Sequence, residues 1–163
     1  GMGSEGVVST GGEPLGPMAG VAALIAAIRA RQPEATIEIE TNGTVLPSPA
    51  LVESVDLFMV SPKLGHAGVE ERLALRPRAL SAFAGLERAF FKFVARDQAD
   101  VATVAALADR YGIARGRVYI MPEGTAAAAL DRVGAAIVDA VIDHGFAYSD
   151  RLHIRLFGDK RGV

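Results

Sequence analysis

Short runs rich in valine, isoleucine and phenylalanine alternate along this chain with longer stretches of helical periodicity. The clearest run is Thr36–Glu40, where isoleucines face one side and polar residues the other, as in a half-buried strand. Val55–Val60 is nearly all apolar, which predicts a strand covered on both faces. The strands expected from these runs are Gly6–Thr10, Thr36–Glu40, Val55–Val60, Ala89–Val94, Val118–Met121 and Arg151–Phe157.

Helical periodicity lies between most of these runs. The expected helices are Met18–Arg31, Arg78–Glu87 after Pro77, a helix that Asp97 or Asp100 caps and that ends at Tyr111, and an alanine-rich helix that Thr125 caps and that ends near His144. Strands that alternate with helices favour an α/β fold with a largely parallel sheet. In such sheets, ligands bind at the carboxyl ends of the strands.

Composition excludes several classes of protein. Half of the 163 residues are hydrophobic, so the chain can bury a core, and its length suits one domain, residues 1–163. The net charge of −2 argues against a nucleic-acid partner. No apolar run approaches the roughly 20 residues of a membrane helix. The start, residues 1–6, is expected to be a tag remnant or irregular and lacks the features of a signal peptide, so we expect a cytoplasmic protein.

Cysteine is absent from the chain. A disulfide, a thiolate zinc site, a cysteine nucleophile or a cysteine-ligated iron–sulfur cluster therefore cannot form from these residues alone. No spacing of histidine and carboxylates predicts a metal site, and His66 and His144 are expected to be non-catalytic. Ser9 and Ser61 lack an evident His–Asp relay, which argues against a hydrolase.

Polar or glycine-rich segments follow five of the expected strands, and we predict that they form one site. They are Ser9–Pro14, Glu40–Thr44, Ser61–Lys63, Ala95-Arg96 and Met121–Gly124. Glu38, Glu40 and Lys92 should point away from the apolar side of their strands. Because buried charges are costly unless paired, these three predict either a salt-bridged core or a wet ligand cavity.

These motifs, in this order, resemble the 7-carboxy-7-deazaguanine synthase family of radical S-adenosylmethionine enzymes. The resemblance runs from Val7 to the end of the chain. The residues that carry it are Ser9–Leu15, Glu38–Thr44, Val60–Leu64, Phe91–Val94, Val118–Gly124, Asp150–Ile154 and Phe157–Gly162.

The resemblance implies a partial (β/α)6 barrel of the radical S-adenosylmethionine type. Three cysteines of the family bind a [4Fe–4S] cluster that cleaves S-adenosylmethionine. The resulting radical and Mg²⁺ convert 6-carboxy-5,6,7,8-tetrahydropterin to 7-carboxy-7-deazaguanine and ammonia, in the queuosine pathway. In the family, the first strand and its Cys-x₃-Cys-x₂-Cys loop lie before the Gly-Gly-Glu motif, but in this chain only Gly1–Gly6 stand there. We therefore expect the first strand to be missing and this chain to be inactive alone.

The resemblance also implies binding roles, each with a plainer alternative. Gly11-Gly12-Glu13 would bind the cofactor's amino group, or form a plain turn. Glu40, Thr41 and Asn42 would contact its ribose and carboxylate, or form an Asn-Gly turn. Ser61 and Lys63 would bind the carboxylate, or simply end a strand. The predicted cofactor-binding residues are Thr10, Gly11, Gly12, Glu13, Glu40, Thr41, Asn42, Ser61, Lys63 and Met121, the last either against the adenine or in the core.

Three residues are predicted to bind the pterin substrate. Lys92 would contact it directly or pair with Glu38 or Glu40. His153 and Arg155 would bind its carboxylate, or lie on a solvated edge strand.

Three hypotheses follow for the chain as a whole. It is an enzyme domain completed by a cysteine-bearing N-terminal segment or partner chain, a non-catalytic remnant that binds S-adenosylmethionine or a pterin, or a self-associating module that forms a homodimer through an open sheet edge.

Overall fold

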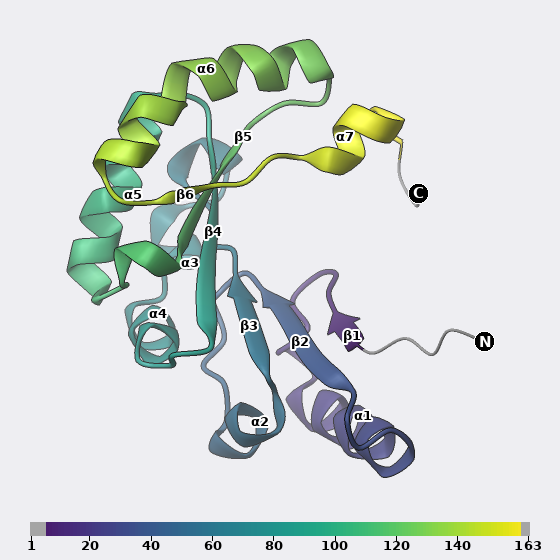
Figure 1. Cartoon of the computed structure of the whole chain (residues 1–163). Coiled ribbons are helices and arrows are strands. Elements are labelled where there is room, and N and C mark those ends of the chain that lie inside the picture. Colours follow the sequence, from purple (N-terminus) through teal and green to yellow (C-terminus); the bar gives the residue numbers. More distant parts are fainter. Residues whose placement is uncertain (1–5, 161–163) are drawn as a thin grey trace. The chain divides into compact units, whose positions relative to one another are not determined.

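The computed structural model describes residues 6–160, so most of the expected start and the tail residues Arg161 and Gly162 lie outside the described residues. The chain divides into two compact units, one up to Phe90 and one from Phe91 onward. Figure 1 labels the helices and strands of both units.

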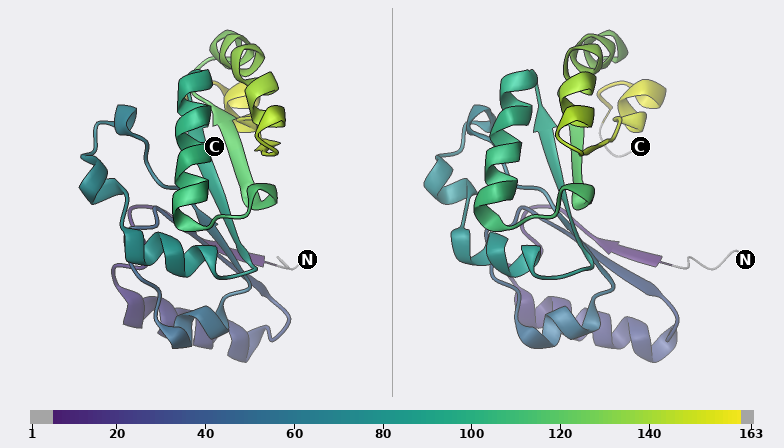
Figure 2. Two further views of the ribbon diagram at one scale, coloured as in Figure 1. Left: turned by 90° about the vertical axis from the view of Figure 1, so that its left-hand side faces the viewer. Right: turned by 60° about the vertical axis from the view of Figure 1, so that its left-hand side comes forward.

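The first unit contains three parallel strands in chain order. Val7 of β1 pairs with Ile37 of β2, and Ile39 of β2 pairs with Phe58 of β3. Helices α1 and α2 lie side by side on one face of these strands (Figure 2). The elements of this unit are β1 Gly6–Ser9, α1 Met18–Arg31, β2 Thr36–Thr41, α2 Pro49–Ser54, β3 Leu57–Val60, the short 3-10 helix η1 Gly65–Ala67, α3 Glu71–Ala74 and α4 Pro77–Ala84.

The two faces of β2 differ as its alternating sequence predicts. Ile37 and Ile39 are buried, and Glu38 and Glu40 on the other face are half-buried. Burial of the isoleucines against the helices supplies the hydrophobic stabilisation of this layer. The opposite face of β2 is left for polar side chains.

The second unit also contains three parallel strands in chain order. Phe93 of β4 pairs with Ile120 of β5, and Tyr119 of β5 pairs with Ala147 of β6. Helices α5 and α6 pack against each other. The elements are β4 Ala89–Ala95, which begins at the boundary between the units, α5 Gln98–Tyr111, the 3-10 helix η2 Arg115–Arg117, β5 Val118–Pro122, α6 Ala127–Asp143, β6 Ala147–Tyr148 and α7 Leu152–Phe157.

The expected ends of α5 are confirmed. The Asp97 side chain accepts a hydrogen bond from the backbone N–H of Asp100 at 2.9 Å, which is N-cap geometry. Gly112 ends the helix in the left-handed conformation, with φ of 71°. Within residues 6–160, no helix is both long enough and apolar enough to cross a bilayer.

The expected strand Arg151–Phe157 is wrong, because Leu152–Phe157 is the helix α7. Its alternation of apolar and charged residues also places Leu152 and Leu156 four residues apart, which is helical spacing. Ile154 alone among its residues is buried. The last strand is instead the two-residue β6, which the sequence did not predict.

Two further predictions need correction. The strand β3 begins at Leu57, and its Leu57 and Met59 are half-buried, so only one of its faces is fully covered. Helix α6 begins after Ala126 without a side-chain cap, so Thr125 does not cap it. An uncapped helix leaves its first backbone N–H groups to other partners.

Candidate functional site

A hydrogen bond between two predicted site residues joins the carboxyl ends of β1 and β2. Thr10 Oγ1 donates to Glu40 Oε2 at 3.0 Å. The parallel pairing of Ser9 with Ile39 brings these two ends together, because Thr10 and Glu40 directly follow that pair. The structure thus places these two residues at one edge of the first unit.

The carboxylate of Glu13 connects the turn after β1 to the end of β2. It accepts hydrogen bonds from the backbone N–H of Leu15 at 3.0 Å and of Asn42 at 2.9 Å. The Thr41 hydroxyl lies 2.8 and 2.9 Å from its two oxygens. Thr41 is only 2% exposed and Glu13 is half-buried, so this contact is partly buried. Glu13 is therefore held by three donors of its own chain.

A tight turn follows β2. Thr41 Oγ1 accepts from the backbone N–H of Gly43 at 3.1 Å, and Asn42 Oδ1 accepts from that of Thr44 at 2.9 Å. Gly43 has φ of 76°, and a Cβ there would lie 2.8 Å from Val60 Cγ1. Only glycine meets both conditions without a shift of the chain. The Asn-Gly turn expected as the plainer alternative is therefore present, and its residues also lie at the strand ends where the site is predicted.

The turn formed by Gly11 and Gly12 faces open space. Their φ values are 94° and 56°, and a Cβ added to either would meet nothing within 4 Å. The space above the turn is open to a ligand, and glycine allows a close approach of its backbone.

The end of β3 is tied to β2 through the main chain. The backbone N–H of Ser61 donates to the carbonyl oxygen of Thr41 at 2.7 Å. Pro62 is buried and Lys63 is exposed. All nine cofactor-binding residues predicted in the first unit therefore lie at or directly after the carboxyl ends of its three strands.

This edge offers carboxylate, hydroxyl and amide oxygens together with one exposed ammonium group. Such a set can accept hydrogen bonds from an ammonium or from ribose hydroxyls and can bind a carboxylate. Both carboxylates of this edge are engaged by the chain: Glu13 by Thr41 and Asn42, and Glu40 by the exposed Thr10 among its contacts.

In the second unit, the predicted residues Lys92 and Met121 lie on the same half-buried face of β4 and β5. Lys92 pairs with Tyr119 and Met121 with Val94 in the parallel register. Met121 lies at the carboxyl end of β5, and Lys92 lies in the middle of β4. Lys92 is therefore further from the strand ends than Met121.

Two contacts order the strand ends of the second unit. The backbone N–H of Glu123 donates to the carbonyl of Ala95 at 2.9 Å. Arg96 donates from Nε to Asp100 Oδ2 at 3.0 Å, and this hydrogen bond raises the pKa of Arg96. Asp100 is therefore committed to the start of α5.

The other two predicted substrate residues, His153 and Arg155, lie on α7 and are exposed. Arg155 Nη1 donates to Asp131 of α6 at 2.8 Å, and Arg155 Nε donates to Asp150. Its positive charge is thus balanced by two carboxylates of the chain. This geometry favours a role for Arg155 in holding α7 against α6.

Asp150 has a lowered pKa. Desolvation alone would raise it, but the hydrogen bonds from the Arg155 side chain and the Arg151 backbone N–H, together with the charge of Arg155, outweigh desolvation. The carboxylate form of Asp150 is therefore favoured by its neighbours.

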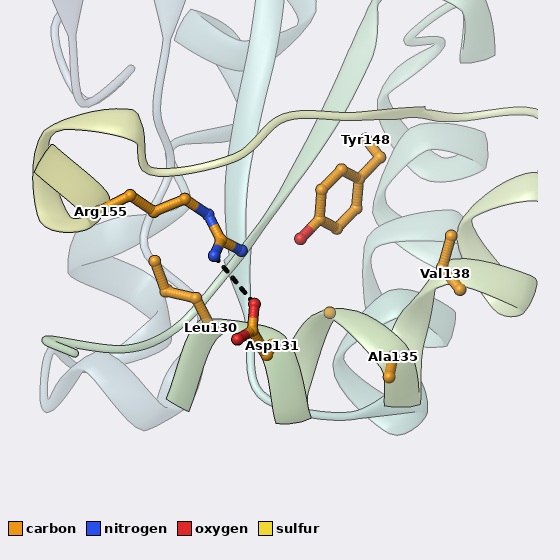
Figure 3. A pocket seen from close by; sticks show the side chains of 7 residues that line it. Leu130, Asp131, Ala135, Val138, Tyr148 and Arg155 are labelled. Carbon is orange, nitrogen blue, oxygen red and sulfur yellow. Dashed lines mark hydrogen bonds and ion pairs between the residues drawn. The ribbon is translucent and has the colours of Figure 1, made fainter. Parts of the chain in front are cut away.

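A pocket of about 240 Å³ lies beside this ion-pair network. Figure 3 shows the Tyr148 hydroxyl pointing toward the Arg155–Asp131 pair above α6. Burial raises the pKa of Tyr148, and the charge of Asp150 adds to the effect. The lining residues are Leu130, Asp131, Gly134, Ala135, Val138, Tyr148 and Arg155.

No protein-family model matches the chain. The 7-carboxy-7-deazaguanine synthase of Pyrobaculum aerophilum is 38% identical over 157 residues, which cover 96% of this chain and 67% of that protein. The chain belongs to the 7-carboxy-7-deazaguanine synthase family. The synthase of Rhodopirellula baltica is 32% identical, with 99% of this chain and 65% of that protein covered. The chain spans about two thirds of the length of these family members.

A solved structure supports the fold of the family. A domain of pyruvate-formate lyase-activating enzyme from Bacteroides vulgatus superposes with a TM-score of 0.59 and 14% sequence identity. The match covers 89% of this chain and 98% of that domain. The expected α/β fold of the radical S-adenosylmethionine type is therefore confirmed.

Sequence reasoning missed several contacts at these strand ends. It gave no role to Arg151, whose Nη1 donates to the Gly124 carbonyl at 2.9 Å. It also missed Asp131 and Asp150 as partners of Arg155. Asp150 lies before α7 and is five residues from Arg155, outside the spacing of three or four residues that indicates an ion pair on a helix, so no local signal predicted this contact.

Proposed function

We propose that this chain binds S-adenosylmethionine at the carboxyl ends of its strands, as part of a 7-carboxy-7-deazaguanine synthase. The observation that carries the proposal is the linkage of Glu13, Thr41 and Asn42. These hydrogen bonds hold the turn after β1 and the turn after β2 together. The chain in which they occur is related to 7-carboxy-7-deazaguanine synthases. An edge built in this way is preorganised for a polar ligand.

The residues of this edge fit the amino-acid end of the cofactor. The open turn at Gly11 and Gly12 leaves backbone carbonyl groups available to the cofactor's ammonium group. The half-buried Glu40, at the end of β2, would accept hydrogen bonds from the ribose hydroxyls, and the exposed Lys63 would bind the carboxylate. Met121, at the end of β5, has the soft side chain that suits packing on adenine.

The residues of this chain do not fit a [4Fe–4S] cluster, because none of them is a cysteine. In residues 6–160, no three histidine or carboxylate side chains are grouped so that they could hold a metal ion. Ligands for the family's cluster would therefore come from a cysteine-bearing segment or chain. We propose that turnover of the pterin to 7-carboxy-7-deazaguanine requires that addition.

Lys92 and His153 remain the proposed contacts to the pterin substrate. Lys92 lies on the half-buried face of β4, and His153 is exposed on α7. Arg155 is a weaker candidate than either, because two carboxylates already bind its guanidinium group.

Calorimetry with S-adenosylmethionine and S-adenosylhomocysteine tests the binding proposal. We expect saturable binding by the chain and a loss of about tenfold in affinity for Glu40→Gln. Glu34→Gln is the control, because Glu34 is exposed and lies before β2 at the opposite end of the strand. Absence of heat with either ligand would overturn the proposal.

A complementation experiment tests the enzymatic part. The chain is fused to, or mixed with, a segment that supplies three cysteines in the Cys-x₃-Cys-x₂-Cys spacing, under anaerobic reducing conditions. We expect cleavage of S-adenosylmethionine and formation of 7-carboxy-7-deazaguanine. Binding without cleavage in the completed protein would favour the non-catalytic alternative.

Self-association is a second candidate function, favoured by the apolar surface of α7. Leu152, Leu156 and Phe157 are 63%, 64% and 48% exposed. Contact between two copies would remove this apolar area from water. Light scattering coupled to gel filtration tests it, since Leu152→Ser with Leu156→Ser should then convert a dimer into a monomer. A monomeric wild-type protein would contradict it.

A further inference from the structure

The carbonyl group of Gly124 is held by a guanidinium group from a distant part of the chain. Arg151 Nη1 donates to this oxygen at 2.9 Å, across 27 residues of sequence. Gly124 belongs to the segment that connects β5 to α6, and Arg151 directly precedes α7. The contact therefore links the C-terminal segment to the end of β5.

The segment around Gly124 has few other attachments. Pro122 has no backbone N–H to donate, and α6 begins without a side-chain cap. The described hydrogen bonds near Gly124 are from the N–H of Glu123 to Ala95 and from the first turn of α6 to Ala126. Without Arg151, the carbonyl of Gly124 would lose its one side-chain partner.

The backbone at Gly124 also lies close to the first turn of α6. A Cβ at this position would be 2.9 Å from Leu130 Cδ2 and 3.2 Å from Ala129 Cβ. The backbone of Gly124 therefore has little room to shift toward α6. Because the fit is this tight, a contact that fixes the carbonyl also fixes the path of the segment.

Arg151 differs from three other arginines of the second unit. Arg96, Arg115 and Arg155 each form an ion pair with an aspartate. Within residues 6–160, Arg151 has no ion-pair partner, and its buried Nε has no hydrogen-bond acceptor. A buried donor without an acceptor lowers stability. Proteins tolerate such unfavourable groups mainly at positions that have a function.

We infer that Arg151 is a positioning residue that orders the segment Met121–Gly124 through the Gly124 carbonyl. The consequence for ligand binding rests on the proposed function, in which Met121 packs on the adenine. Arg151 then couples the C-terminal segment to cofactor affinity without touching the cofactor. Its side chain acts through the backbone of Gly124.

Hydrogen–deuterium exchange and calorimetry on the full chain test this inference with three variants. Arg151→Met removes the donor and keeps most of the aliphatic stem. Arg151→Lys restores a charged donor. Arg115→Met is the matched control, because Arg115 also donates to a carbonyl in the same unit, that of His144 at 3.2 Å, at the other end of α6.

We expect Arg151→Met to raise amide exchange in residues 123–127 by about tenfold and to weaken S-adenosylhomocysteine binding by a similar factor. Arg151→Lys should recover part of both effects. Arg115→Met should leave exchange in residues 123–127 and the affinity unchanged. Such a pattern separates positioning from a general loss of stability.

Two results would overturn the inference. One is unchanged exchange in residues 123–127 of Arg151→Met, and the other is an equal effect of Arg115→Met on exchange in these residues. If the wild-type chain binds no S-adenosylhomocysteine, the proposed function fails, and exchange in residues 123–127 still decides whether Arg151 orders this segment.

Discussion

The hydroxyl of Thr41 lies between the two carboxylate oxygens of Glu13, at 2.8 and 2.9 Å. Thr41 is 2% exposed and Glu13 is half-buried, so the contact is partly shielded from water. Through it, a residue of the Gly-Gly-Glu motif holds the end of the neighbouring strand. The motif thus has a structural function that does not depend on any ligand.

Replacement of Thr41 by valine should destabilise the chain by about 1–3 kcal/mol, because it leaves a half-buried carboxylate without one of its donors. Chemical denaturation measures the change. Thr103→Val is the control, since the Thr103 hydroxyl donates only to the Ala99 carbonyl on the exposed side of α5. Equal losses in the two variants would contradict the role given to the Glu13–Thr41 contact.

Alanine at position 43 should destabilise the chain by about 1–3 kcal/mol or more, because its positive φ and the contact with Val60 both oppose a side chain. Gly20→Ala should have the opposite effect. Gly20 lies inside α1 with nothing within 4 Å of an added Cβ, so alanine should stabilise that helix by up to about 1 kcal/mol. Thermal unfolding of both variants tests the contrast in sign.

Gly134 makes room for Tyr148. A Cβ at Gly134 would lie 2.6 Å from the Tyr148 hydroxyl oxygen, although alanine is otherwise the better helix residue. We expect Gly134→Ala to destabilise the wild-type chain and to be neutral or stabilising in a Tyr148→Phe background. A double-mutant cycle measures the coupling, and additive effects would show that the hydroxyl does not require the glycine.

The ion pair of Asp150 should make stability depend on pH in the acidic range. Its pKa in the folded chain is lowered, so its stabilising contribution is fully present above the ordinary aspartate pKa of about 4. The contribution is lost as the pH falls through the folded pKa. The free energy of unfolding should fall less between neutral and acidic pH in Asp150→Asn than in the wild type. Chemical denaturation at both pH values measures it, and an equal fall in the two proteins would contradict this assignment.

Local patterns in the sequence predicted much of the fold. The alternation in Thr36–Glu40 predicted the strand and its buried face correctly. Side chains alternate between the two faces of a strand, so the local sequence is enough to place Ile37 and Ile39 on the same face. Asp97 and Gly112 marked the ends of α5 by their capping chemistry. Such signals act over a few residues, so they can be read before the tertiary structure is known.

The errors occurred where distant residues decide the structure. The segment 152–157 is helical, and the ion pairs of Arg155 with Asp131 and Asp150 hold it. A period of two and a period of 3.6 cannot be distinguished over so short a run, and the partner Asp131 lies 24 residues away.

The candidate site was predicted in part for the same reason. The rule that ligands meet the carboxyl ends of parallel strands placed Thr10 and Glu40 correctly at one edge of the first unit. That Glu13 would be engaged by Thr41 and Asn42 depends on the register between β1 and β2, which no local pattern specifies.

Thr41 offers its carbonyl group to Ser61 and its hydroxyl group to Glu13, so a single residue touches the tips of both neighbouring strands. The three tips therefore cannot relax one at a time. We therefore expect a ligand that binds at the end of one of these strands to make the other two ends more rigid. A substitution at the end of β3 should likewise alter the turn at Gly11 and Gly12, although it does not touch that turn.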